Sequence, residues 1–178
     1  MPAIRLYQGI APTLGARVYV DASALVIGKV NLGDDVSVWP STMIRGDVNR
    51  IEIGARTSVQ DGCVLHVTSP NPQYPQGIPL IVGTDVTIGH SVTLHACTVG
   101  NWCLIGMGAV VLDDVQIEDY VMVGAGSLVT PRSRLQAGGL YIGSPARRAR
   151  DLKPAEIDTI KRSAPHYVKL KDEYLRAG

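Results

Sequence analysis

Three of the four histidines of this chain, His66, His90 and His95, fall within thirty residues of one another, while His166 lies near the C-terminus. Neutral imidazole is the commonest metal ligand among side chains, and three imidazoles with a fourth position open to water are typical of catalytic zinc. A structural zinc site uses four ligands, usually with thiolates among them. A histidine taken singly is more often a surface or hydrogen-bonded structural residue. The metal interpretation therefore depends on whether the fold brings these three side chains together.

A six-residue repeat of aliphatic residues surrounds the histidines. In the second half of the chain its positions are Val82, Ile88, Leu94, Val99, Ile105, Val111, Ile117, Val123 and Val129, and only the step from Leu94 to Val99 is one residue short. The first half contributes Ile27, Leu32, Val38, Ile44, Ile53, Val59 and Leu65. The fourth residue after a repeat position is small or β-branched, as in Val86, Val92, Thr98, Cys103, Ala109, Val115, Val121 and Ser127. Repeats this short predict a parallel β-helix, whose stacked coils bury a continuous inner column.

The alternative all-β architecture is a sandwich, but alternating sandwich strands would not keep a six-residue period through nine successive positions. We expect the β-helix to occupy residues 1–140, with the pattern ending after Thr130 and an extruded, proline-rich loop at 68–79. An exit segment and a helix fill 141–178. The helix begins at Pro154, has an apolar face of Ile157, Ile160, Tyr167, Leu170 and Tyr174 that packs along the β-helix, and is kinked or broken at Pro165.

Composition narrows the class of protein. The 178 residues include 46% hydrophobic residues but no Phe, so Val, Ile, Leu and Ala must build the core. A net charge of +1 and scattered basic residues argue against nucleic acid as a partner. The absence of a long apolar run or a signal-like N-terminus predicts a cytoplasmic protein with no membrane association. Cys63, Cys97 and Cys103 lie inside the repeat, where we expect them to be buried free thiols.

The repeat register indicates where the histidine side chains point. His66 and His95 each follow a repeat position directly, so on consecutive coils they stack on the outer surface, provided that the extruded loop accounts for the extra residues. Coils lie ~4.8 Å apart, which lets two imidazoles reach one metal ion at ~2.1 Å each. His90 stands two residues after Ile88, near the corner of the preceding face, and points elsewhere. It is either unrelated or it completes a metal site on a neighbouring subunit.

Several segments resemble the gamma-class carbonic anhydrases and their close relatives. They are RGDVNRIEIG from Arg45, VQDGCVLH from Val59 and IGHSVTLHACTVG from Ile88. The tail YIGSPARRAR resembles the exit segment of hexapeptide-repeat acyltransferases. The resemblance covers roughly residues 10–150, and it implies a left-handed β-helix, although crossover connections are otherwise right-handed.

By this resemblance the protein is a homotrimer that hydrates carbon dioxide reversibly to bicarbonate. Its metal, Zn²⁺ or else Fe²⁺ or Co²⁺, would be held by His66, His90 and His95. Gln60 would orient the metal-bound water, and Tyr141 would line the pocket. Arg45 would pair with Asp61 across the subunit interface, with Asp47 supporting Arg45. An ordinary interface network of ion pairs among Arg45, Asp47 and Asp61 is compatible with that role.

The sequence departs from the best-studied type of this family at its proton-transfer glutamates. Val48 follows the RGD tripeptide where that type has a glutamate, and the loop 68–79 holds no acidic residue. Export of a proton limits fast hydration, so we expect slow turnover unless buffer, Tyr141 or another route substitutes. Three alternatives stay open: an acyl-thioester hydrolase on the same metal, an acetyltransferase with a histidine base and no metal, and a non-catalytic subunit of a larger assembly.

Overall fold

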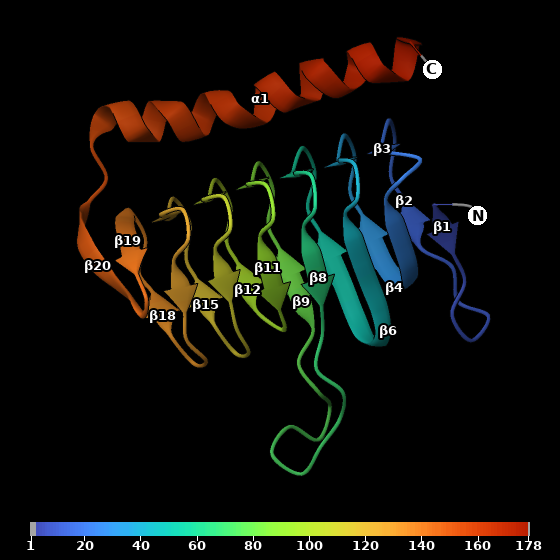
Figure 1. The fold of residues 1–178 in the computed structure, drawn as a ribbon, viewed down its shortest axis with the longest axis horizontal. Coiled ribbons are helices and arrows are strands. Elements are labelled where there is room, and N and C mark those ends of the chain that lie inside the picture. Colours follow the sequence, from blue (N-terminus) through green and yellow to red (C-terminus); the bar gives the residue numbers. More distant parts are fainter. Residues whose placement is uncertain (1–2, 178) are drawn as a thin grey trace.

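The computed structural model describes residues 3–177, in which short strands wind into a three-sided prism flanked by one long helix (Figure 1). The strands pair in parallel from coil to coil, forming a left-handed parallel β-helix, as predicted.

Each side of the prism is a stack of strands. The first face contains β1 (Ile4–Arg5), the leading parts of β4 (Leu25–Leu32) and β6 (Met43–Ile53), β8 (Val64–His66), β11 (Thr93–His95), β14 (Val110–Val111) and β17 (Leu128–Val129). The second face contains β2 (Thr13–Leu14), the trailing parts of β4 and β6, β9 (Leu80–Val82), β12 (Thr98–Val99), β15 (Gln116–Ile117) and β18 (Arg134–Leu135). The third face contains β3 (Tyr19–Val20), β5 (Ser37–Val38), β7 (Ser58–Val59), β10 (Thr87–Ile88), β13 (Leu104–Ile105), β16 (Met122–Val123), β19 (Gly139–Gly143) and β20 (Ala146–Asp151).

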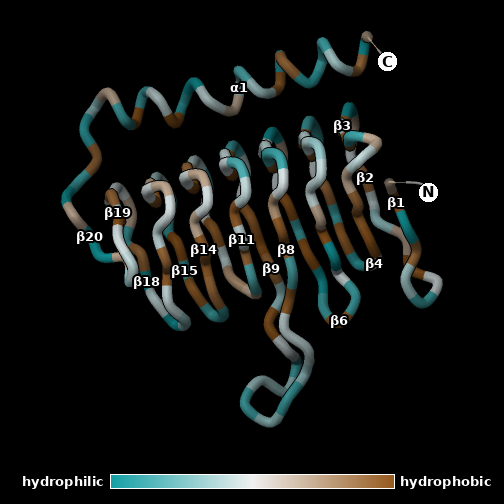
Figure 2. Tube along the Cα trace, in the orientation of Figure 1, coloured by the Kyte–Doolittle hydropathy of each residue, from teal (hydrophilic) through white to brown (hydrophobic). Residues whose placement is uncertain are grey.

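The aliphatic repeat forms the core. Every repeat position from Val82 to Val129 is buried, and apolar residues recur along the strands while the corners are more polar (Figure 2). Two assignments were wrong. Val26, not Ile27, points inward, because β4 pairs Val26 with Ile44 and Ile27 with Arg45. At the short step, Cys97 takes the buried corner position and Thr98 is partly exposed.

The repeat also continues beyond Thr130, contrary to our prediction. Leu135 and Tyr141 keep the six-residue step and are buried on the second and third faces. The winding of coils ends after β19, where β20 turns back antiparallel to it and extends the same sheet. The turn-rich sequence there concealed the period, because glycines and polar residues fill the corners between inward positions.

The C-terminal helix α1 (Pro154–Ala177) lies along the third face, against β3, β5, β7 and β10 (Figure 1). Pro154 occupies its first turn, where a missing N–H costs nothing, and the Glu156 carboxylate accepts from the Lys153 backbone N–H at 2.8 Å. Of the two outcomes expected at Pro165, a kink or a break, the break does not occur, since the helix continues through that residue. Packing against the prism compensates for the one backbone hydrogen bond that a proline removes.

Two kinds of contact attach α1 to the prism. Tyr167 and Tyr174 pack against Trp39, with ring centroids 6.2 and 5.2 Å apart. The fully buried Lys171 forms an ion pair with Asp35 at 3.0 Å. Within the described residues, no helix is both long enough and apolar enough to cross a membrane.

The segment between β8 and β9 projects from the prism as a loop (Figure 1). Its neck is closed by an antiparallel bridge between Thr68 and Ile78, whose backbone N–H groups each donate to the other's carbonyl at 3.0 Å. The excursion leaves the register of the coils intact, because β11 still pairs with β8 and places His95 beside His66.

Candidate metal centre

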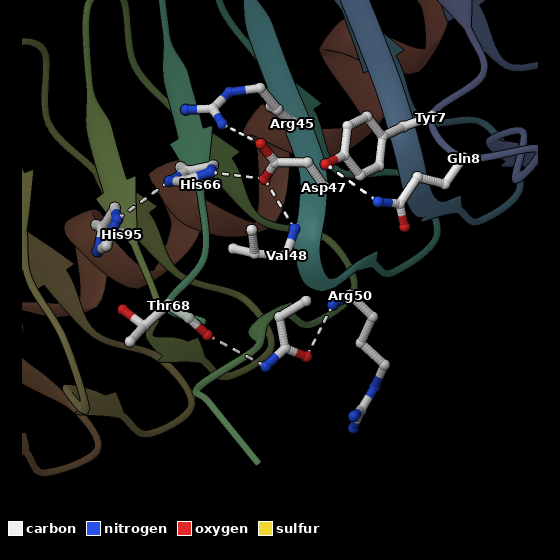
Figure 3. Close-up of polar contacts among 10 residues, drawn as sticks. Tyr7, Gln8, Arg45, Asp47, Val48, Arg50, His66, Thr68 and His95 are labelled. Atoms are coloured by element: carbon white, nitrogen blue, oxygen red, sulfur yellow. Dashed lines mark hydrogen bonds and ion pairs between the residues drawn. The ribbon is translucent and has the colours of Figure 1, made fainter. Parts of the chain in front are cut away.

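A column of four polar side chains crosses consecutive coils at one edge of the first face. Figure 3 shows three of them, Asp47, His66 and His95. His66 Nδ1 lies 3.2 Å from His95 Nε2, as the register predicts. The other nitrogen of His66, Nε2, is 2.9 Å from Asp47 Oδ1. The other nitrogen of His95, Nδ1, is 2.6 Å from Asp113 Oδ1. The two imidazoles therefore face each other with a carboxylate behind each of them.

This arrangement determines which imidazole nitrogens are free. A carboxylate only accepts hydrogen bonds, so the nitrogens that face Asp47 and Asp113 carry the protons. The nitrogens left over, His66 Nδ1 and His95 Nε2, then present lone pairs to each other at 3.2 Å. Two facing lone pairs repel unless a proton or a metal ion lies between them. Two nitrogens that share one tetrahedral zinc ion at ~2.1 Å are about 3.4 Å apart, so this donor pair fits such an ion.

His90 has the same local arrangement in a different place. Its Nδ1 is 2.7 Å from Asp61 Oδ2, and its Nε2 is left for another partner. The side chain is 49% exposed, compared with 20% for His66. His90 lies in the turn before β11, whereas His95 is the last residue of that strand, so the two imidazoles stand at opposite edges of the first face. Residues 3–177 of one chain accordingly contain no cluster of three metal-ligating side chains.

Arg45 and Asp47 form an ion pair beside His66 (Figure 3). Burial acts to raise the pKa of Asp47, but hydrogen bonds from His66, Arg45 and the Val48 backbone outweigh it, so the pKa lies below its usual value. Asp47 is therefore a carboxylate at neutral pH. Arg45 and Asp61 do not pair within the chain, and their side chains are 43% and 47% exposed.

Gln60 is buried where β7 meets the helix. Its side chain hydrogen-bonds Tyr167 of α1, which lowers the pKa of that phenol, while burial raises it by more. Gln60, His90 and Tyr167 line the polar part of a hollow of about 430 Å³ between the third face and α1, whose other walls include Met107 and Met122. Because His90 lines the hollow, a small molecule bound there would lie near that imidazole.

The structure does not bring Tyr141 to the other predicted site residues. Its ring is a core side chain three coils beyond Ile88, and its hydroxyl accepts from the Gln136 backbone N–H at 2.7 Å. Asp113, by contrast, was missed by the sequence reasoning. The available signal was its spacing, since β11 pairs with β14 at an offset of 17 residues and Asp113 follows His95 by 18, just past one coil.

Comparison with known proteins gives relatives over nearly the whole chain. The bacterial transferase hexapeptide family (six repeats) matches residues 96–131. Protein YrdA of Escherichia coli is 51% identical over 98% of this chain and 95% of its own length. A mitochondrial gamma carbonic anhydrase of Arabidopsis thaliana is 41% identical over 90% of this chain, which spans 57% of that protein. A carbonic anhydrase of Geobacillus kaustophilus is 37% identical, covering 96% of this chain and 90% of its own length.

Among solved structures, a hexapeptide transferase family protein from Anaplasma phagocytophilum superposes with a TM-score of 0.89. It is 36% identical to this chain, and the match covers 97% of this chain and 98% of that one. Relatives described as carbonic anhydrases and a relative described as a transferase thus share this fold.

Proposed function

The chain belongs to the gamma carbonic anhydrase family of hexapeptide-repeat proteins, and from this membership we propose that it is a homotrimeric metalloenzyme that hydrates carbon dioxide reversibly. One observation carries the proposal. His66 and His95 direct two ring nitrogens at each other, 3.2 Å apart, and the other nitrogen of each ring faces a carboxylate. Such carboxylate–histidine pairs orient imidazoles for metals and raise their basicity.

The third ligand in this proposal is His90 of a neighbouring subunit. One chain offers two imidazoles at one edge of the first face and a third, carboxylate-backed imidazole at the opposite edge. A closed threefold ring brings unlike edges together at three identical seams. Exposed apolar side chains flank both edges, Val64 beside His66 and Met107 beside His90, as expected of surfaces that pack against another chain.

The residues around the proposed ion have distinct roles. When bound, the ion, zinc or else iron or cobalt, supplies the Lewis acidity that makes water a nucleophile near neutral pH. Gln60, buried and held by Tyr167, offers a fixed amide to orient that water. Arg45 of one subunit would pair with Asp61 of the next, and these two half-exposed groups lack each other within the chain. Asp47 holds both Arg45 and His66.

Proton export is the step for which the chain is poorly equipped. Val48 is 41% exposed next to Asp47, and the loop 68–79 is neutral. Tyr141 is buried in the core, where its hydroxyl is hydrogen-bonded to the Gln136 backbone. Hydration in this proposal is therefore slow and depends on buffer to remove the proton.

Metal analysis of protein purified without chelators tests the site. His95→Ala should lose most of the bound metal, whereas His166→Ala should keep it, because His166 is an exposed residue of α1 whose ring contacts only Tyr167 among the aromatic rings. Equal metal content in the two variants would remove the basis of the proposal.

Stopped-flow hydration of carbon dioxide at several imidazole buffer concentrations tests the reaction. Turnover should rise with buffer until chemistry limits it, and Val48→Glu should weaken that dependence. A metal-loaded protein that leaves carbon dioxide unchanged but hydrolyses acyl thioesters would place the same site in a different reaction. Acetyl transfer by metal-free protein would contradict the proposal altogether.

A further inference from the structure

Asp113 is the carboxylate behind the proposed metal ligand His95, and its second oxygen links it to a different part of the chain. Its Oδ1 lies 2.6 Å from His95 Nδ1. Its Oδ2 accepts a hydrogen bond from the Thr68 hydroxyl. Because both carboxylate oxygens are engaged on opposite sides, the group cannot rotate away from His95 without breaking a contact to Thr68.

Thr68 itself is held by the neck of the extruded loop. Besides the paired backbone hydrogen bonds with Ile78, its carbonyl accepts from Asn49 Nδ2 at 3.3 Å (Figure 3). Asn49 Nδ2 also donates to the Gln76 carbonyl at 2.9 Å, on the returning arm of the loop. Asn49 comes two residues after Asp47, so the β6 corner that supports His66 also fastens the base of the loop.

We infer that the neck of the loop is a positioning device for the metal centre, in which Thr68 holds Asp113 and Asp113 holds His95. Asp113 fixes the tautomer of His95 with its proton on Nδ1, so that Nε2 faces His66 with a free lone pair. The loop thereby has a structural purpose at the site, although it lacks acidic residues for proton transfer. As far as it concerns metal, this inference rests on the proposed function.

Metal affinity is the first test. Zinc dissociation constants of the purified protein, measured by competition with a chromophoric chelator, should rise about 10–100-fold in Asp113→Ala. Asp113→Asn keeps an acceptor but loses the charge, and Thr68→Val removes only the hydroxyl, so both should give smaller increases. Asp114→Asn is the matched control, because this neighbouring carboxylate binds Arg134 instead. An Asp113→Ala affinity within about twofold of wild type would overturn the inference.

The histidine tautomer is a second test that needs no metal. Selective ¹⁵N labelling of the four histidines, in metal-free protein at alkaline pH, reports which ring nitrogen of His95 carries the proton. We expect Nδ1–H in wild type and Asp114→Asn, and a mixture or reversal in Asp113→Ala. If wild type binds no zinc, the proposed function fails, and the tautomer alone decides the role of Asp113. An unchanged His95 tautomer in Asp113→Ala would reject that role. If Asp113→Ala does not fold, Asp113→Asn and Thr68→Val carry both tests.

Discussion

Mixing two inactive variants tests whether each metal site is shared between subunits. At each interface between subunits, His66→Ala removes a metal ligand from one subunit and His90→Ala removes a metal ligand from the other. Each variant alone should therefore leave every site without metal. The two variants are unfolded and refolded together in equal amounts. A metal site between two neighbouring subunits is then complete only under two conditions: the subunit that supplies His66 and His95 must be a His90→Ala chain, and the subunit that supplies His90 must be a His66→Ala chain. Each condition holds with a probability of one half, so about one quarter of the seams should regain metal.

The assay is metal content per trimer after weakly bound ions are removed, with native mass spectrometry to count mixed trimers. In a matched mixture of His66→Ala with His166→Ala, about one half of the sites should bind metal. His166→Ala keeps all three ligands, so a site is defective only when the subunit that supplies His66 is the His66→Ala chain. If His66→Ala and His90→Ala form mixed trimers that stay as empty as the parent variants, all ligands come from one chain. The placement of His90 on a different edge from His66 and His95 would then be irrelevant to metal binding.

Three further predictions concern stability and reactivity. Leu94 is fully buried, so Leu94→Ala should lower the free energy of unfolding, measured by denaturant titration, by about 3 kcal/mol. Leu6 is 67% exposed, so the control Leu6→Ala should change it by less than about 0.5 kcal/mol. Arg17 and Lys171 hold the pKa of Asp35 below its usual value, against the effect of burial. The two ion pairs therefore stabilise the fold at any pH above the pKa that Asp35 has in the unfolded chain. This stabilisation is lost as the pH falls through the lower pKa that Asp35 has in the folded protein. Asp35→Asn should cost about 3 kcal/mol at neutral pH, a difference from wild type that narrows in acid. Burial raises the pKa of the Cys63 thiol to about 11 and of Cys103 to about 12, so thiol reagents at neutral pH should label the protein only after unfolding.

The sequence alone was enough to predict the β-helix, because a six-residue period places the same kind of side chain at the same point of every coil. It failed where two neighbouring residues were equally apolar. Val26 and Ile27 lie side by side in β4, and only pairing with β6 decides that Val26 faces the core. It also failed at Leu135 and Tyr141, where turn-rich sequence concealed inward positions that the stacked coils reveal.

The stacking of His66 and His95 was likewise predictable, because each directly follows a repeat position and strand alternation is local. Their carboxylates were not. Asp113 and Asp114 are adjacent acids in the sequence, yet one faces His95 and the other Arg134. Which of the two faces His95 depends on the corner geometry and on Thr68, which comes from a different part of the chain.

The remaining features were decided by contacts between distant segments. The helix α1 returns along the third face and brings Tyr167 to Gln60, although more than a hundred residues separate them. The loop neck brings Thr68 to Asp113, 45 residues away. Periodicity encodes which side of a strand is buried, since that is a property of consecutive residues. The hydrogen-bond partner of a polar side chain, and with it the free nitrogen of each histidine, depends on the position of another coil or of the helix, and only the tertiary structure supplies that position.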